Sequence, residues 1–192
     1  MRLVWLAAAL LVPSVGFSQI PTFEIVAPQS KINFKVDASV SIAGVFEKWT
    51  ADLHFTTPYV ESAVLDITAQ AASVNSGSGL KDGKLKGSEF FDAKNDPEIT
   101  FRSKKIIQTA LDSYSVVGDF TIRGMTNEQT LVVTYSPDYP DEGHVRGQMV
   151  FDRRQYGMTH GIPLVKIADR VEVDIDLLLH RTSGNRPIQK VP

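Results

Sequence analysis

The 192-residue sequence contains no cysteine. Thiol catalysis, disulfide bonds, cysteine-ligated zinc and iron–sulfur clusters are therefore excluded. An excess of charge of one sign is also lacking, because 20 Lys and Arg stand against 22 Asp and Glu, for a net charge of −2. A nucleic-acid-binding domain needs a basic face, so this balance argues against that class. With 43% hydrophobic residues, the chain must be stabilised by an ordinary apolar core.

An apolar run lies at the start of the chain. Arg2 precedes uninterrupted apolar residues over 3–12, and the small residues Gly16 and Ser18 follow. This layout is typical of a secretory signal peptide, and the run is shorter than the ~20 residues that a transmembrane helix needs. We therefore predict a signal peptide over residues 1–18 and export to the periplasm, with secretion as the alternative.

Most of the remaining chain alternates between apolar and polar residues with a period of two. Between Lys31 and Ile42, for example, every second side chain is apolar and those between are polar. Only a β-strand places two such sets on opposite faces. Eight segments are predicted to be strands: residues 31–42, 49–55, 63–70, 98–108, 114–123, 131–135, 145–151 and 171–180. A short further strand is predicted near residues 23–25.

Antiparallel strands with one apolar face must cover that face, either as two packed sheets or as a closed barrel. Strands of about ten residues favour the barrel, because sandwich strands are usually shorter. The predicted fold class is therefore all-β, an eight-stranded antiparallel barrel whose interior can be filled or can hold one small ligand. Small residues at inward positions, such as Ala63, Gly118 and Gly147, indicate a cavity. The alternative is that they face bulky partners, as in packed interiors.

Three segments depart from the strand pattern. Residues 75–92 are predicted to be a connection with one or two short helical turns, in which Leu85 and the Phe90–Phe91 pair close one end of the barrel. Residues 155–169 are predicted to form a loop over a barrel mouth. Residues 182–192, which are poor in apolar side chains, are predicted to be a flexible C-terminal tail.

Side chains suited to catalysis or metal binding form no recognisable motif. His54, His144, His160 and His180 have neither the HxH nor the HExxH spacing of common metal sites. The glycine-rich residues 75–79 lack the Gly-Lys-Ser/Thr ending of a phosphate-binding loop. We predict no catalytic residues, no metal site and no cofactor.

The middle of the chain resembles a known family. Residues 81–92 read Lys-Asp-Gly-Lys-Leu-Lys-Gly-Ser-Glu-Phe-Phe-Asp, and residues 97–101 read Pro-Glu-Ile-Thr-Phe. These stretches are similar to the Arg-Asp-x-His-Leu-Arg-Ser-x-Asp-Phe-Phe-Asp and Pro-x-Ile-x-Phe blocks of the YceI-like family, which binds lipids and polyisoprenoids.

Further blocks extend this resemblance. Residues 118–126, Gly-Asp-Phe-Thr-Ile-Arg-Gly-Met-Thr, are similar to the family's Gly-Asp-Leu-Thr-Ile-x-Gly-Val-Thr. Residues 154–158 resemble its Arg-x-Asp/Trp-Phe-Gly block, and residues 30–34 with 44–46 look like the start of the domain. The ordered blocks cover roughly residues 23–181, nearly all of the chain after the predicted signal peptide.

The resemblance implies an exported, lipocalin-like antiparallel barrel over residues 19–181. It also implies an apolar tunnel for a long isoprenoid or a similar amphiphile, and no catalytic residue. Gln29 and Lys84 stand where the family often has histidine, so a head-group contact made by those histidines does not carry over to this chain.

The predicted function is that of a periplasmic binding or carrier protein that holds a long apolar amphiphile, a polyisoprenoid or similar lipid, in the barrel tunnel. Each buried CH₂ group of such a ligand contributes about 0.8 kcal/mol. The alternatives are an enzyme that acts with a bound isoprenoid quinone or haem-like cofactor, and an interaction module with a filled core.

The predicted partners are a lipid-like ligand and no nucleic acid, with transient contact to a membrane surface. Lys81, Lys84 and Lys86 are candidates to contact a phosphate or an anionic membrane, and the alternative is that they form a solvated charged loop. The oligomeric state is left open. The candidate ligand-binding residues are inward apolar side chains: Phe34, Val36, Val40, Phe46, Trp49, Leu53, Phe55, Leu65, Ile67, Phe91, Phe101, Phe120, Ile122 and Phe151.

Overall fold

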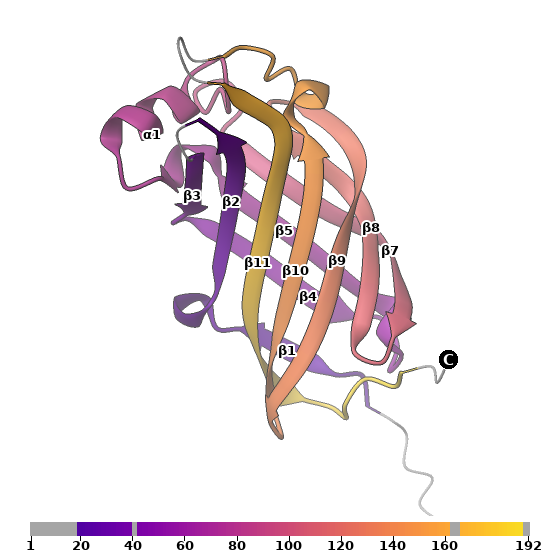
Figure 1. The fold of residues 1–192 in the computed structure, drawn as a ribbon. Helices are drawn as coiled ribbons and strands as arrows, with labels where there is room; N and C mark the ends of the chain where they lie inside the picture. Colours follow the sequence, from indigo (N-terminus) through magenta and orange to yellow (C-terminus); the bar gives the residue numbers. More distant parts are fainter. Residues whose placement is uncertain (1–18, 40–41, 162–165, 190–192) are drawn as a thin grey trace, which may run out of the picture.

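A closed antiparallel barrel of eight strand paths forms the molecule in the computed structural model, which describes residues 19–39, 42–161 and 166–189 (Figure 1). This confirms the predicted fold class, and the predicted helical turn between residues 75 and 92 is also present. The predicted signal peptide over residues 1–18 and the candidate residue Val40 lie outside the described residues.

The described chain contains eleven strand segments, one α-helix and four short 3₁₀ turns. The strands are β1 (Thr22–Ile25), β2 (Lys31–Ala38), β3 (Ile42–Phe46), β4 (Trp49–Phe55), β5 (Ala63–Gln70), β6 (Val74–Asn75), β7 (Glu98–Ala110), β8 (Ser113–Ile122), β9 (Met125–Tyr139), β10 (Glu142–Asp152) and β11 (Ile167–Ser183). The helix is α1 (Gly79–Lys86), and the 3₁₀ turns are Ala27–Gln29, Val60–Ser62, Ala71–Ser73 and Arg153–Tyr156.

The barrel closes through β1 and the long strand β11. Strands β4, β5, β7, β8, β9, β10 and β11 pair in that order, and β1 pairs with both β11 and β4. Along the same edge of β11, Ile25 of β1 lies opposite Leu179, whereas Lys31 of β2 lies opposite Asp176. Strands β1 and β2 therefore share one strand path, which is broken by the turn Ala27–Gln29.

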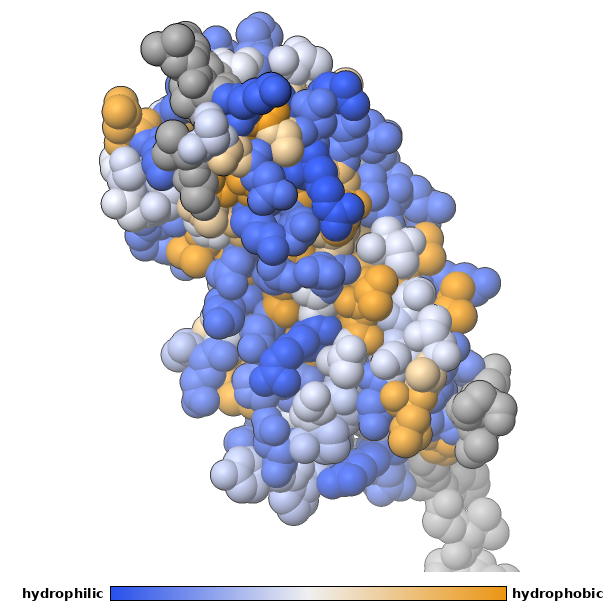
Figure 2. All heavy atoms as spheres, viewed as in Figure 1, coloured by the Kyte–Doolittle hydropathy of each residue, from blue (hydrophilic) through white to orange (hydrophobic). Residues whose placement is uncertain are grey.

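The period of two places the apolar side chains inside the barrel. Burial alternates residue by residue along β5 and β8, and Ile67, Phe101 and Phe120 lie opposite one another on β5, β7 and β8. Polar side chains cover most of the outer face shown in Figure 2. A register slip of one residue would exchange these two faces, so burial of the apolar set fixes the register.

The prediction of one continuous strand over residues 31–42 is wrong. Strands β2 and β3 form a hairpin, in which Val36 pairs with Ile42 and Phe34 pairs with Gly44. Alternation with a period of two continues unchanged through such a reversal, so the pattern alone does not detect it. Gly44 lies within β3, where an added Cβ would come within 2.9 Å of the Phe34 ring.

Different segments lie at the two ends of the barrel, which we call upper and lower as drawn in Figure 1. At the upper end, buried Leu85 on α1 and the buried Phe90 and Phe91 that follow it join the core. At the lower end, the Ile188 amide donates to the Pro58 carbonyl at 2.8 Å. The described part of the predicted flexible tail thus makes specific hydrogen bonds. No helix within the described ranges has the length and apolar character needed to cross a membrane.

Gly118→Ala should destabilise the barrel by about 2 kcal/mol, because the added methyl group overpacks the interior. An added Cβ at position 118 would lie 2.8 Å from the Phe101 ring and against the Arg102 carbonyl. The matched control is Gly83→Ala on α1, where the added Cβ meets no atom within 4 Å and alanine favours the helix. Urea denaturation of both variants measures the difference, and equal midpoints would contradict this packing.

Candidate ligand-binding site

Two cavities lie one above the other inside the barrel. The lower cavity has a volume of about 430 Å³, and the upper cavity has a volume of about 90 Å³. Protein sites for small molecules usually measure about 300–1,000 Å³. The lower cavity is therefore of ligand size, whereas the upper cavity has room only for a short end of a chain.

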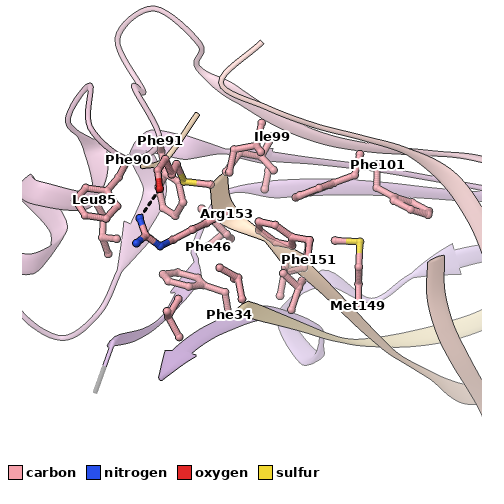
Figure 3. A pocket seen from close by; sticks show the side chains of 18 of the residues that line it. Phe34, Phe46, Leu85, Phe90, Phe91, Ile99, Phe101, Met149, Phe151 and Arg153 are labelled. Carbon is pink, nitrogen blue, oxygen red and sulfur yellow. Dashed lines mark hydrogen bonds between the residues drawn. The ribbon is translucent and has the colours of Figure 1, made fainter. Parts of the chain in front are cut away.

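Aromatic side chains fill much of the upper half of the barrel. The ring centroids of Phe34 and Phe46 are 5.6 Å apart, and each of these rings lies 5.7 Å from the Phe91 ring. Figure 3 shows these three rings at one end of the upper cavity. Phe120 and Phe151 form a second close pair, with centroids 5.1 Å apart. Such pairs add about 0.5–1.5 kcal/mol each beyond their burial, so this half behaves mainly as a packed core.

Arg153 is a buried charged residue at the edge of the upper cavity, only 7% exposed. Its guanidinium donates to the carbonyls of Met158, His160 and Ala168 and forms an ion pair with Asp169 at 3.0 Å. Figure 3 shows the Arg153 side chain among the aromatic rings of the upper cavity. The side chain therefore ties the loop after the 3₁₀ turn to the start of β11. These contacts engage all three nitrogen atoms of the guanidinium, so the role of Arg153 is structural.

Two glycines lie between the cavities. An added Cβ at Gly118 would come within 2.8 Å of the Phe101 ring, and one at Gly147 within 2.8 Å of Ile175 and 3.1 Å of Leu131. No side chain lines both cavities. At these two positions the small residue thus faces a bulky partner, which is the alternative expected for a packed interior. Phe101, Leu131 and Ile175 form a constriction between the two cavities, which we call the waist.

Most of the wall of the lower cavity is apolar. It includes Phe23 and Phe55, whose ring centroids are 5.7 Å apart. The other apolar and aromatic lining residues are Leu53, Val60, Ala63, Leu65, Ile106, Tyr114, Val116, Val133, Tyr135, Pro137, Pro140, Val145, Leu177, Leu179 and Pro187. Such a wall suits a hydrocarbon tail.

Polar side chains border the lower cavity where the C-terminal segment crosses the barrel end. Gln189 donates to the Tyr114 hydroxyl at 2.8 Å and to the Asp112 carboxylate at 3.0 Å. Arg181 forms an ion pair with Asp141. Arg186 also lines this cavity and donates to the Pro140 carbonyl at 3.1 Å. A few placed polar groups on an apolar wall are typical of a site that orients its ligand.

The two tyrosines of the lower cavity keep their protons at neutral pH. Burial raises the pKa of the Tyr114 hydroxyl, and the nearby Asp112 charge raises it further. Burial also raises the pKa of Tyr135, against the opposing effects of Arg186 and Arg181. Both hydroxyls are therefore able to donate as well as accept hydrogen bonds.

The structure divides the candidate residues between the two cavities. Leu53, Phe55 and Leu65 line the lower cavity. The larger group lines the upper cavity: Phe34, Val36, Phe46, Ile67, Phe91, Phe101, Phe120, Ile122 and Phe151. Trp49 lines neither cavity and packs, half-buried, against the core. The ligand-binding role of these residues stays a prediction.

Several residues of the lower cavity are not among the ligand-binding residues predicted from the sequence. Tyr114, Val133, Tyr135 and Leu177 occupy inward positions of predicted strands, so the alternation could have identified them. Arg181 continues the inward alternation of Leu177 and Leu179 on β11, one residue beyond the predicted strand. Arg186 and Gln189 carry no such signal, because they lie beyond β11, and only the path of the C-terminal segment brings them to the cavity.

None of the four histidines, all within the described residues, lines either cavity. His54 pairs with Asp52 at 2.6 Å, and His144 pairs with Asp176 at 2.5 Å, and neither histidine lines a cavity. Within residues 19–39, 42–161 and 166–189, no three His, Asp or Glu side chains are grouped closely enough to hold a metal ion.

A family model described as the YceI-like domain matches residues 23–179. A UPF0312 protein of Vibrio parahaemolyticus is 27% identical over 104 residues, and one of Staphylococcus aureus is 33% identical over 93 residues. These alignments cover 53% and 45% of this chain and 55% and 52% of the two relatives. The chain thus spans about half the length of the curated relatives that it matches.

Solved structures share the fold. BcnA of Burkholderia cenocepacia superposes with a TM-score of 0.73 at 24% identity, covering 81% of this chain and 99% of BcnA. A polyisoprenoid binding domain from Saccharophagus degradans gives a TM-score of 0.65 at 14% identity, covering 83% of this chain and 98% of that domain. At these identities the likeness establishes the barrel fold.

Arg153→Met should lower the free energy of unfolding by about 3 kcal/mol, because three carbonyls lose their donor in a buried place. Arg154→Gln is the matched control, since the Arg154 side chain is 57% exposed and pairs with Asp152 and Asp169 at the surface. Exposed pairs contribute about 1 kcal/mol or less. Chemical denaturation compares the variants, and a larger loss in Arg154→Gln would contradict the assigned role of Arg153.

The stability of the protein should fall as the pH rises above the ordinary tyrosine pKa of 10.0. The unfolded chain ionises Tyr114 near that pH, whereas the folded chain, with its raised pKa, keeps the proton longer. Tyr114→Phe should therefore show a shallower loss of stability with pH above this value. Denaturation midpoints across the alkaline range measure the slope, and an unchanged slope would contradict the assignment.

Proposed function

Because the chain belongs to the YceI-like family, we propose that its barrel binds a lipid-like amphiphile with an isoprenoid-type tail and carries it in the periplasm. The polyisoprenoid binding domain of Saccharophagus degradans, which has the same fold, supports this class of ligand. The proposed periplasmic location of the protein rests on the signal-peptide pattern of residues 1–18, and secretion is the alternative.

The observation that carries the proposal is the lower cavity of about 430 Å³, with its apolar wall and polar border. Ten buried CH₂ groups contribute about 8 kcal/mol, from which association subtracts several kcal/mol. Useful affinity therefore favours a longer tail that continues toward the upper cavity. Phe101, Leu131 and Ile175 at the waist must then rotate aside.

Binding is better supported than catalysis. The lower cavity contains two carboxylates, Asp112 and Asp141, and each is engaged by a donor, Gln189 or Arg181. No histidine lines either cavity among the described residues, so the tyrosines there have no imidazole base beside them. These features and the family favour a carrier over an enzyme.

Native mass spectrometry of the exported protein, purified gently from a bacterial host, tests the proposal. We expect a bound species whose mass corresponds to an isoprenoid or similar lipid. Val145→Phe should reduce its occupancy about tenfold or more, because the larger side chain fills the lower cavity that Val145 lines.

The matched control is Val132→Phe on the neighbouring strand β9. Val132 is 56% exposed on the outer face, so the same added volume should leave occupancy unchanged. A wild-type protein that carries no lipid and takes up no added isoprenoid would contradict the proposed function. Equal loss in both variants would show that the lower cavity is not the site.

A further inference from the structure

The Tyr135 hydroxyl is a polar group of the lower cavity without a partner. No described residue forms a hydrogen bond with it, although Tyr135 lines the cavity. Its ring lies across Gly143, where an added Cβ would come within 2.7 Å of the ring and of the hydroxyl. Because position 143 is a glycine, the Tyr135 ring has room to lie there. The Tyr135 hydroxyl is then available to donate a hydrogen bond to a ligand.

The positive and negative residues that line this cavity are equal in number. Asp112 and Asp141 line the cavity together with Arg181 and Arg186. The Arg181 guanidinium is already engaged by Asp141 and by the Gly184 carbonyl. Arg186 donates to the Pro140 carbonyl at 3.1 Å. Because two carboxylates offset the two guanidinium groups, the lower border has no net positive charge to offer to an anionic ligand.

The upper cavity does not supply such a charge either. Arg153 is the charged residue of the upper cavity, and its donors are taken by three carbonyls and Asp169. A phosphate or diphosphate head group buried at either end would lose its hydration in a site with no net positive charge, which is unfavourable. A hydroxyl or carbonyl head group needs only one or two hydrogen bonds to offset its loss of water.

We propose that the lower border of the cavity selects an uncharged head group, an alcohol or a carbonyl, and that the Tyr135 hydroxyl is its direct hydrogen-bonding contact. This inference rests on the proposed function and adds the orientation of the ligand. The tail points to the waist, and the head group lies beside the C-terminal segment.

Calorimetric titration of the purified chain with two probes tests this selection. Geranylgeraniol and geranylgeranyl diphosphate share one tail and differ only in the head group. We expect the alcohol to bind about tenfold tighter or more. Tighter binding of the diphosphate would overturn the head-group inference and leave the proposed function standing, whereas binding of neither probe would contradict the proposed function itself.

Tyr135→Phe tests the direct contact, because phenylalanine keeps the ring over Gly143 and removes the hydroxyl. The affinity for geranylgeraniol should fall about threefold to tenfold, the effect of one lost hydrogen bond. The control is Tyr139→Phe on the same strand, whose side chain is 69% exposed and lines neither cavity. An unchanged affinity in Tyr135→Phe would overturn the contact.

Asp112→Asn tests the charge balance with little change of shape. Asp112 has a left-handed backbone, with φ of 58°, which asparagine tolerates well, and the amide oxygen can still accept from Gln189. Removal of one negative charge should strengthen diphosphate binding about threefold or more relative to alcohol binding. No gain for the diphosphate would show that charge balance does not set the selectivity.

Discussion

Closure of the lower half of the barrel depends on β1, a strand of four residues. This strand pairs with β11 through residues 22–25 and with β4 through the single pair Thr22 and His54. Without these pairings, the apolar wall that contains Phe55, Leu177 and Leu179 would face water. The short strand thus closes a curved sheet into a barrel, and the lower cavity exists only because the barrel closes.

The two halves of the barrel have different roles. The upper half is packed by aromatic rings and tied at its loop by Arg153, so it contributes mainly stability. The lower half contains a cavity of about 430 Å³. Polar groups border this cavity where the C-terminal segment crosses the barrel end. A protein with this division can hold a ligand without losing its packed core, because the lower cavity and the core lie along different segments of the same strands.

Much of the fold could be predicted from the sequence, because alternation with a period of two reports directly on which side of a strand faces water. The same signal missed the hairpin between β2 and β3, since a reversal preserves the alternation. It also favoured large aromatic residues such as Phe34, Phe46 and Phe91 as ligand contacts. These rings contact one another at the upper cavity, and which inward residues surround empty space depends on packing across the barrel.

The polar border could not be predicted, because Arg186 and Gln189 reach the cavity through the path of a segment that has no strand pattern. A crystal structure of the chain grown with geranylgeraniol tests the central claim most directly. The account predicts electron density for the tail between Leu65, Val116 and Leu177, with the oxygen beside Tyr135. Density for the alcohol only outside the barrel, or a lower half filled by protein side chains, would contradict it.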